Sequence, residues 1–230
     1  MRRLVLWDVD HTLIETGGVG GEVFAEAFQG ATGRRLESMP DPTGLTEPEI
    51  FRRALAALGI EDGGLFERFT ELQAAEYRAR GGELLTRGRV LPGVHAALRA
   101  VGAAPDLLQS VLSGNTRVAA RAKLAVFRLG GYFDLEVSAG GDDDPVRAHL
   151  VPVVWERAAE KYGIRFDADS TVLVGDTPAD IETGHANGCR VAAVATGRTS
   201  AEELRAAGAD HVFAHLSDTP AVLTALRATA

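Results

Sequence analysis

Short apolar runs alternate with longer segments of helical periodicity along most of the 230-residue chain. An apolar run bounded by turn residues indicates a buried strand, and apolar residues that recur every three or four positions indicate a helix. The expected strands are residues 4–7, 107–112, 135–138, 171–174, 191–195 and 211–213, and the expected helices are residues 94–101, 117–127, 151–162, 179–186, 200–207 and 220–228. This alternation predicts an α/β fold built on a doubly wound, Rossmann-like parallel sheet.

Residues 15–89 interrupt the alternation, because no segment within them has the pattern of a strand. Residues 22–31, 47–58 and 65–80 have the periodicity of amphipathic helices, and joints containing glycine or proline separate them. We therefore expect an α-helical cap domain of residues 16–89, inserted into a core domain of residues 1–15 and 90–230. Hinges between the two are expected near residues 16–21 and 81–91.

The composition is that of an ordinary folded soluble protein, with 46% hydrophobic and 24% charged residues. No segment approaches the roughly 20 apolar residues of a membrane helix, and the N-terminus lacks the long apolar region of a secretory signal. We therefore expect a cytoplasmic protein without a membrane partner. A net charge of −8 argues against a nucleic-acid partner, which needs a clustered basic face. The single cysteine, Cys189, excludes an internal disulfide and a cysteine-rich zinc site.

Two aspartates, Asp8 and Asp10, follow directly on the first expected strand. Residues two apart in an extended segment point to the same side, so the two carboxylates should emerge together where the strand ends. Two anions held this close repel each other unless a cation lies between them or one is protonated. The simpler alternative is a pair of solvated loop aspartates, and the choice depends on the rest of the chain.

Two later strands also end in polar residues, at the edge where open α/β sheets bind ligands. The first is followed by Ser113, Gly114 and Asn115, a stretch that on its own is typical of an N-cap turn but could also hold an anion on exposed amides. The second is followed by Asp176, with Asp180 about one helical turn later. This second site repeats the arrangement of Asp8, in which a carboxylate follows an apolar strand.

A basic residue is expected near these strand ends, because a transferring phosphoryl group needs positive charge at its oxygens. Arg147 precedes the helix of residues 151–162, and Lys123 lies within the helix that follows Asn115. Arginine offers a planar fork for phosphate, but either residue could be an exposed helix charge, and the residues alone leave the choice open. Lys123 and Lys161 are the only lysines of the chain.

These motifs resemble those of the haloacid dehalogenase superfamily. The run from Asp8 to Thr12 is similar to its first motif, residues 112–115 to its second, and residues 175–180 to its fourth. Order and spacing agree over essentially the whole chain. The helical insertion resembles the cap of the phosphoglycolate phosphatase-like branch, and residues 43–50 resemble a cap segment common in that branch. The third motif departs from the pattern, since relatives mostly carry lysine followed by proline where this chain has Arg147. The placement of Arg147 before the helix matches this motif, so the resemblance favours Arg147 for the basic role, with Lys123 as the alternative.

The resemblance implies a Mg²⁺-dependent phosphatase that forms an aspartyl-phosphate. Asp8 would be the nucleophile, and Asp10 would protonate the leaving oxygen and then activate water. The resemblance assigns the metal to the Asp8 side chain, the Asp10 main-chain carbonyl and Asp176.

The remaining residues would bind phosphate or support the site. The implied phosphate-binding groups are Ser113, Gly114, Asn115 and Arg147. Asp180 would orient a ligand or a metal-bound water, and Thr12 would support the loop that carries Asp10.

Other activities known on this fold are less compatible with the sequence. Dehalogenases that resemble this family lack the second aspartate, Asp10. Related phosphonate hydrolases use a cap lysine, which residues 15–90 do not contain. A sugar-phosphate mutase stays an alternative, although such relatives also rely on a cap lysine, and so does a non-catalytic phosphate-binding or interaction module.

The expected substrate is a small phosphate monoester resembling phosphoglycolate. The cap arginines Arg34, Arg35, Arg52 and Arg53 could bind an acidic substrate but are typical of solvated helix charges. His11, Glu15 and residues 17–21 are weaker candidates near the entrance. The sequence leaves the protein as a monomer or a homodimer.

Overall fold

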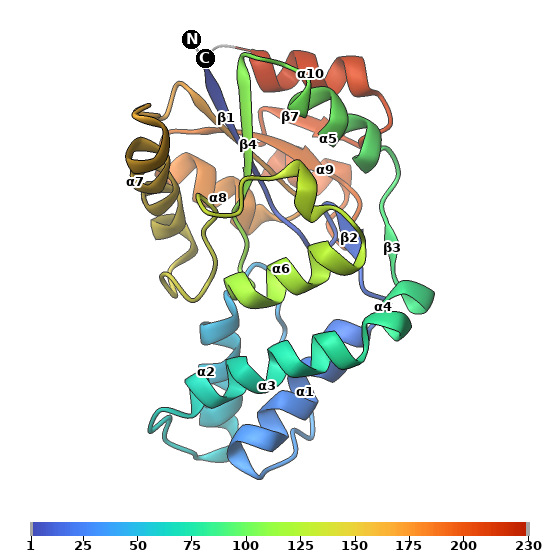
Figure 1. Ribbon diagram of the computed structural model, residues 1–230, viewed down its shortest axis with the longest axis vertical. Helices are drawn as coiled ribbons and strands as arrows, with labels where there is room; N and C mark the ends of the chain where they lie inside the picture. Colours follow the sequence, from blue (N-terminus) through green and yellow to red (C-terminus); the bar gives the residue numbers. More distant parts are fainter. Residues whose placement is uncertain (1, 229–230) are drawn as a thin grey trace.

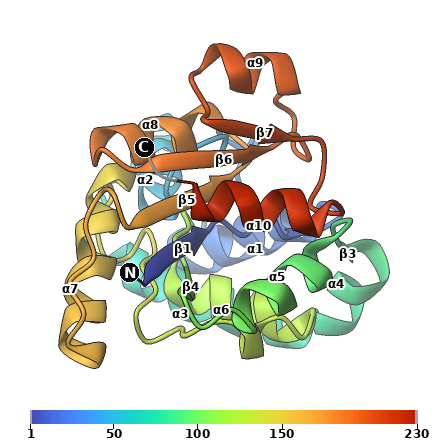
Figure 2. The same ribbon diagram turned by 90° about the horizontal axis from the view of Figure 1, so that it is seen from above.

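The structure is a computed structural model that describes residues 2–228. A five-stranded, fully parallel sheet forms the core, with the strand order β4-β1-β5-β6-β7. Figure 2 shows these strands side by side, with helices on both faces. The doubly wound α/β fold predicted from the sequence is confirmed. The strands are β1 (Arg3–Trp7), β4 (Leu107–Val111), β5 (Thr171–Gly175), β6 (Arg190–Val194) and β7 (His211–Phe213).

Strand β1 packs against helices on both faces because its buried side chains alternate between them. Val5 and Trp7 belong to the apolar cluster on the side of α5 (Val94–Gly102), α6 (Arg117–Val126) and α10 (Thr219–Arg227). Leu4 and Leu6 belong to the cluster on the side of α7 (Leu150–Tyr162), α8 (Pro178–Ala186) and α9 (Ala201–Ala206). β1 is therefore an interior strand between β4 and β5, and the residues after it lie between the carboxyl ends of these two neighbours.

The insertion forms a helical cap below the carboxyl edge of the sheet in the view of Figure 1. It contains α1 (Val19–Thr32), α2 (Glu47–Leu58), α3 (Leu65–Ala79) and α4 (Gly81–Arg87). The cap has its own apolar cluster, in which phenylalanine rings from α1, α2 and α3 lie 4.8 to 6.4 Å apart between centroids. Figure 1 places both chain termini at the opposite end of the molecule from this cap.

A short antiparallel ribbon joins the two ends of the insertion. β2 (Ile14–Glu15) pairs with β3 (Arg89–Val90), so the chain leaves and re-enters the core at adjacent points. Strands of two residues carry no readable pattern, and the sequence did not predict them. The ribbon lies at the predicted boundaries of the cap, whose exact division from the core stays a prediction.

One local expectation was wrong. Residues 135–138 form a turn rather than a strand: the Asp134 carboxylate accepts from the Glu136 amide at 3.0 Å, and the Ser138 hydroxyl donates to the Leu135 carbonyl at 2.7 Å. Only Ala139 pairs with the sheet region, through a bridge to Leu112. Residues 81–91, near which the second hinge is expected, consist largely of helix α4, and their role as a hinge stays a prediction.

Two 3₁₀ turns complete the described elements, at Gly130–Tyr132 and Arg147–His149. In residues 2–228 no helix has both the length and the apolar character needed to span a bilayer.

Candidate active site

A cavity of about 240 Å³ lies between the carboxyl edge of the sheet and the cap. β1 and β5 are neighbours there, and the chain order reverses between them, which is the position where open α/β sheets bind ligands. Most of the residues singled out from the sequence line this cavity. They are Asp8, Asp10, Ser113, Gly114, Asn115, Lys123, Arg147, Asp176 and Asp180.

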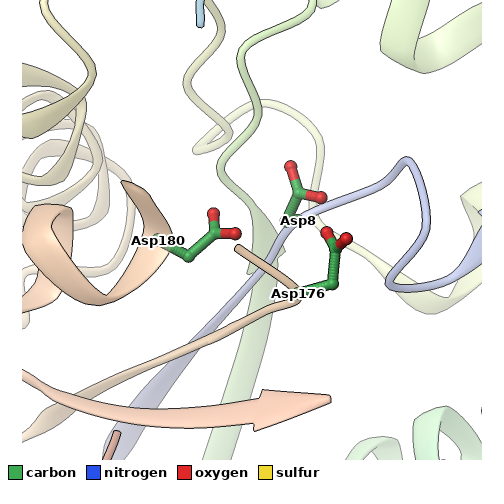
Figure 3. A group of neighbouring side chains, drawn as sticks. All are labelled: Asp8, Asp176 and Asp180. Carbon is green, nitrogen blue, oxygen red and sulfur yellow. The ribbon is translucent and has the colours of Figure 1, made fainter. Parts of the chain in front are cut away.

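Three buried carboxylates, those of Asp8, Asp176 and Asp180, meet at one point of the cavity wall (Figure 3). One oxygen from each lies within 4.8 Å of the others. Asp8 follows β1, Asp176 follows β5, and Asp180 lies in the first turn of α8, so the fold itself brings them together. The Asp10 side chain is not part of this group. Any contribution of Asp10 to a metal site would have to come from its main-chain carbonyl, which stays a prediction.

Burial and mutual repulsion disfavour three negative charges in this group, as the raised pKa values of two of its carboxyls indicate. Burial and the charge of Asp180 raise the pKa of Asp8 to about 7, against the opposing effect of Arg147. Burial and the charges of Asp8 and Asp180 raise the pKa of Asp176 to about 9. Such a group either takes up protons or holds a cation. Carboxylate oxygens are the ligands preferred by hard divalent ions, so the residues present fit a metal of that class.

The Asp8 carboxylate is oriented by two donors on one of its oxygens. Asp8 Oδ1 accepts from the Ser113 hydroxyl at 3.3 Å and from Arg147 Nη2 at 2.9 Å. The same Arg147 nitrogen donates to Asp180 Oδ1 at 2.5 Å. Arg147 is therefore buried between two of the three carboxylates, where its positive charge offsets part of their repulsion.

Asp180 is held by its own helix as well as by Arg147. Its Oδ2 accepts from the Thr177 amide at 3.0 Å and the Thr177 hydroxyl at 2.7 Å, while its own amide donates back to that hydroxyl. This capping box begins α8 and fixes the direction of the carboxylate. Both Asp180 oxygens thus already accept hydrogen bonds, which suits the supporting role expected for this residue.

Asp10 has different surroundings from Asp8, although it lies two residues away. Asp10 Oδ2 accepts from Lys123 Nζ at 2.7 Å and from Asn115 Nδ2 at 2.7 Å. Burial raises the pKa of Asp10, but Lys123 and Asn115 outweigh it and hold the pKa below its usual value. The two candidates for the basic role thus take separate partners: Arg147 contacts Asp8, and Lys123 contacts Asp10.

The loop after Asp10 is tied to the loop after β6. His11 has a left-handed backbone with φ of 60°, and its carbonyl accepts from the Thr196 hydroxyl at 2.5 Å. Thr12 is buried and donates to Asp176 Oδ1 at 3.4 Å, so it supports a carboxylate as well as the loop. Gly197 lies against the other oxygen of Asp176: a Cβ atom at this position would come within 1.8 Å of Asp176 Oδ2.

The cap arginines do not reach the site. Arg34, Arg35, Arg52 and Arg53 are absent from the cavity wall, and the last two pair with Glu49 on their own helix. His11 and two glycines of residues 17–21, Gly20 and Gly21, do line the cavity. Glu15 instead pairs with Arg89. Arg198, in the loop after β6, lies at the cavity and was not anticipated.

Sequence reasoning also missed a buried carboxylate of the cap, Glu47. It accepts from the Thr116 amide at 2.6 Å and from Gln73 at 2.6 Å. A glutamate at the start of a helix is ordinary in sequence, so no local signal distinguishes this one. Gly114 also has a role that was not foreseen, since a Cβ there would lie 2.4 Å from the Leu45 carbonyl of the cap.

The model of the family "haloacid dehalogenase-like hydrolase" matches residues 5–185. The chain belongs to this family. All the site residues named above from β1 to α8 fall within the matched segment, in agreement with the resemblance found in the motifs. No curated protein sequence matches the chain.

Solved structures of similar fold cover nearly the whole haloacid dehalogenase-like chain. One is a hydrolase from Pseudomonas syringae, with a TM-score of 0.70, 17% identity, and coverage of 96% of this chain and 98% of that one. Another is a predicted phosphoglycolate phosphatase from Haemophilus somnus, with a TM-score of 0.68, 19% identity and coverage of 96% and 98%. A third, provisionally named a β-phosphoglucomutase, from Thermotoga maritima, has a TM-score of 0.61, 20% identity and coverage of 97% and 99%. At these identities the likeness establishes the fold.

Proposed function

We propose that this protein is a Mg²⁺-dependent phosphatase that hydrolyses a small phosphate monoester through an aspartyl-phosphate on Asp8. The observation that carries the proposal is the separation of the two aspartates after β1. Asp8 lies among the carboxylates that fit a cation, and Asp10 is held apart by Lys123 and Asn115. The Asp8 carboxylate can therefore attack phosphorus, while the Asp10 carboxylate donates and accepts protons.

In the first half of the reaction an oxygen of Asp8 attacks phosphorus, and the bond from phosphorus to the ester oxygen breaks. The proton of Asp10 goes to that oxygen, so Asp10 must take up a proton before this step. In the second half a water attacks phosphorus and gives a proton to Asp10, which releases inorganic phosphate and restores Asp8. Lys123 and Asn115 hold Asp10 ionised, the state that this second half requires.

The proposed groups around the phosphate supply positive charge and donors. Asp8 and Asp176 would hold the metal together with the Asp10 carbonyl, and Mg²⁺ would offset charge on the phosphoryl oxygens when bound. Ser113, Arg147 and the amides of Gly114 and Asn115 would bind the phosphoryl oxygens. Asp180 would keep Arg147 in place.

The proposed substrate is small and has a polar or acidic end opposite the phosphate. Apolar cap side chains, including Leu45, Ile50 and Tyr77, form part of the wall. Lys123 and Arg147 are each paired with carboxylates, whereas Arg198 forms no ion pair within residues 2–228. A phosphoglycolate-like ester, with a carboxylate near Arg198, fits this distribution of charge. A panel of acidic and neutral phosphate esters tests this choice.

The test of the reaction is release of phosphate from para-nitrophenyl phosphate with and without Mg²⁺. We expect turnover that disappears with a chelator and returns with Mg²⁺. Asp8→Asn should lower kcat by about 10³-fold or more, because it removes the nucleophile. An Asp8→Asn variant as active as the wild type would contradict the assignment of the nucleophile.

The alternatives predict different products. A mutase would convert one sugar phosphate into another without net release of phosphate, and residues 16–89 contain no lysine of the kind that such relatives rely on. A non-catalytic module would bind phosphate esters without turnover on any member of the panel. Either result would replace the proposed function.

A further inference from the structure

A second buried polar cluster joins the cap to the core beside the carboxylates of the active site. The cap contributes Glu47 from the start of α2, and Gln73 and Tyr77 from α3. The core contributes Thr116, at the start of α6, and Lys123 within it. All five side chains are buried, with 7% or less of each residue exposed. Buried polar groups of this kind persist only where each finds a partner, so their contacts define a specific docked arrangement.

Glu47 makes the central contact of this cluster. Its carboxylate, from a cap helix, accepts from the Thr116 amide at 2.6 Å, and its own amide donates to the Gly114 carbonyl at 2.7 Å. The free amides at the start of a helix attract an anion, so Glu47 serves as an acceptor for α6 from a different part of the fold. On the cap side, Gln73 donates to the same carboxylate at 2.6 Å.

The other end of the cluster reaches Asp10. Lys123 Nζ donates to Asp10 Oδ2 at 2.7 Å and to Asn115 Oδ1 at 2.5 Å. The Tyr77 ring of the cap lies 5.5 Å from the same ammonium, within the range of a cation–π contact. Helix α6 lies alongside the cap helix α3, as Figure 1 shows. Lys123 thus lies on α6 and Asn115 just before it, and both the start and the flank of this helix contact the cap.

We propose that Glu47 is a positioning residue, which acts through α6 to hold Lys123 and Asn115 against Asp10 when the cap is docked. The inference rests on the proposed function, in which Asp10 activates the water that hydrolyses the aspartyl-phosphate. Docking of the cap would then complete the hydrolytic half of the reaction. An enzyme whose cap is not docked would still form the aspartyl-phosphate but would hydrolyse it slowly.

The test is the pre-steady-state release of nitrophenolate from para-nitrophenyl phosphate by Glu47→Gln, in the presence of Mg²⁺. Glutamine has nearly the same shape as glutamate, but one of its two polar atoms is a donor rather than an acceptor. That atom would face the donor of Thr116 or of Gln73, so one of these two hydrogen bonds is lost. Nitrophenolate is a good leaving group, so the first half should stay fast. We expect a steady-state kcat lower by about tenfold or more, after a burst that approaches one nitrophenolate per enzyme and exceeds the wild-type burst.

Glu49→Gln is the matched control, since Glu49 lies on the same helix and, within residues 2–228, its ion pairs are with Arg52 and Arg53 of the cap. It should keep the kcat and the burst of the wild type. Adding Glu47→Gln to Lys123→Met should lower kcat by less than the product of the two separate losses, because Glu47 acts on Asp10 partly through Lys123. Gln73→Met removes one donor to Glu47 and should also lower kcat and enlarge the burst, but by less than Glu47→Gln. This variant replaces Glu47→Gln in the test if Glu47→Gln does not fold.

The inference is overturned if Glu47→Gln leaves kcat unchanged, or lowers kcat without enlarging the burst, as a loss of folded enzyme would. It is also overturned if the losses from Glu47→Gln and Lys123→Met multiply. A wild-type protein with no activity on the ester would overturn the proposed function instead, and this inference with it.

Discussion

The two oxygens of the Asp8 carboxylate have different surroundings. Oδ1 accepts hydrogen bonds from Ser113 and Arg147, whereas Oδ2 accepts none from residues 2–228. An oxygen with two donors must give up a hydrogen bond before it can bond elsewhere, which costs about 1 kcal/mol or more. Ser113 and Arg147 therefore fix the direction of Asp8 through Oδ1 and leave Oδ2 available to a ligand.

Gly197 offers a residue-scale test of the carboxylate group, because it packs on Asp176 without touching Asp8. A methyl group at Gly197 would meet Asp176 Oδ2 at 1.8 Å and would also crowd His11. Gly197→Ala should therefore turn the Asp176 carboxylate and raise the Mg²⁺ concentration for half-maximal activity by about tenfold. Gly131→Ala, in an exposed turn with nothing within 4 Å of the added atom, should leave this concentration unchanged. Equal Mg²⁺ dependence in both variants would contradict the role of the loop after β6.

At the scale of elements, the sequence predicts best where a single local pattern decides the structure. The strands that end at Asp8 and Asp176 are apolar runs followed by a carboxylate, and the fold places both where the pattern predicts. Residues 135–138 show the opposite case, because hydrogen bonds of Asp134 and Ser138 override an apolar run. Glu47 could not be found from sequence, since its partner Thr116 lies 69 positions away.

Two arginines bind helix α4 to α1: Arg80, the residue before α4, and Arg87, its last residue. Arg80 and Arg87 both donate to Glu22, and Arg87 also donates to the Gly17 carbonyl at 2.9 Å. Glu83 receives a second set of hydrogen bonds from the same two arginines. The two ends of the cap insertion are therefore fastened to each other by charge as well as by the β2–β3 ribbon.

This network predicts a pH-dependent contribution to stability. Hydrogen bonds from Arg87 and Arg80 lower the pKa of Glu22 to about 2, from its ordinary value of 4.5. A carboxyl whose pKa is lower in the folded state stabilises the fold above pH 4.5, and the contribution disappears as the pH falls toward 2. Glu22→Gln should thus lower the Tm by about 1–2 °C at pH 7. The difference in Tm between this variant and the wild type should become smaller as the pH falls toward 3. Glu71→Gln, which removes an exposed charge without an ion pair in residues 2–228, should show no such narrowing. A Glu22→Gln difference that is constant with pH would contradict the network.

At the scale of the whole molecule, the site belongs to neither the core nor the cap alone. The core supplies the carboxylates and donors, and the cap loop before α2 closes the cavity with residues such as Leu45, whose carbonyl lies against Gly114. Each motif of the core is a short segment of sequence, so its site residues could be predicted from the sequence. The cap side of the cavity depends on long-range packing, since Val19, Val23 and Tyr77 of the cap belong to the same apolar cluster as Val5 and Trp7 of β1. No short pattern encodes such contacts.

The same arrangement makes the stability of the molecule depend on a bound cation. Three buried carboxylates within 4.8 Å destabilise the metal-free fold, and a cation that binds only the folded state stabilises it by mass action. At about 100 times its Kd, Mg²⁺ should raise the Tm by about 5–10 °C. Asp176→Asn should abolish most of this rise, while its metal-free Tm should equal or exceed that of the wild type, because one of the repelling charges is gone. Asp169→Asn changes an exposed aspartate that lies before the amino end of β5, whereas the cluster lies at the carboxyl end of that strand. This variant should keep the full Mg²⁺-dependent rise. The measurement is the Tm of the wild type and the two variants, with Mg²⁺ and with a chelator. If metal-free Asp176→Asn has a lower Tm than the metal-free wild type, the Asp176 carboxylate stabilises the metal-free fold, and the prediction is wrong.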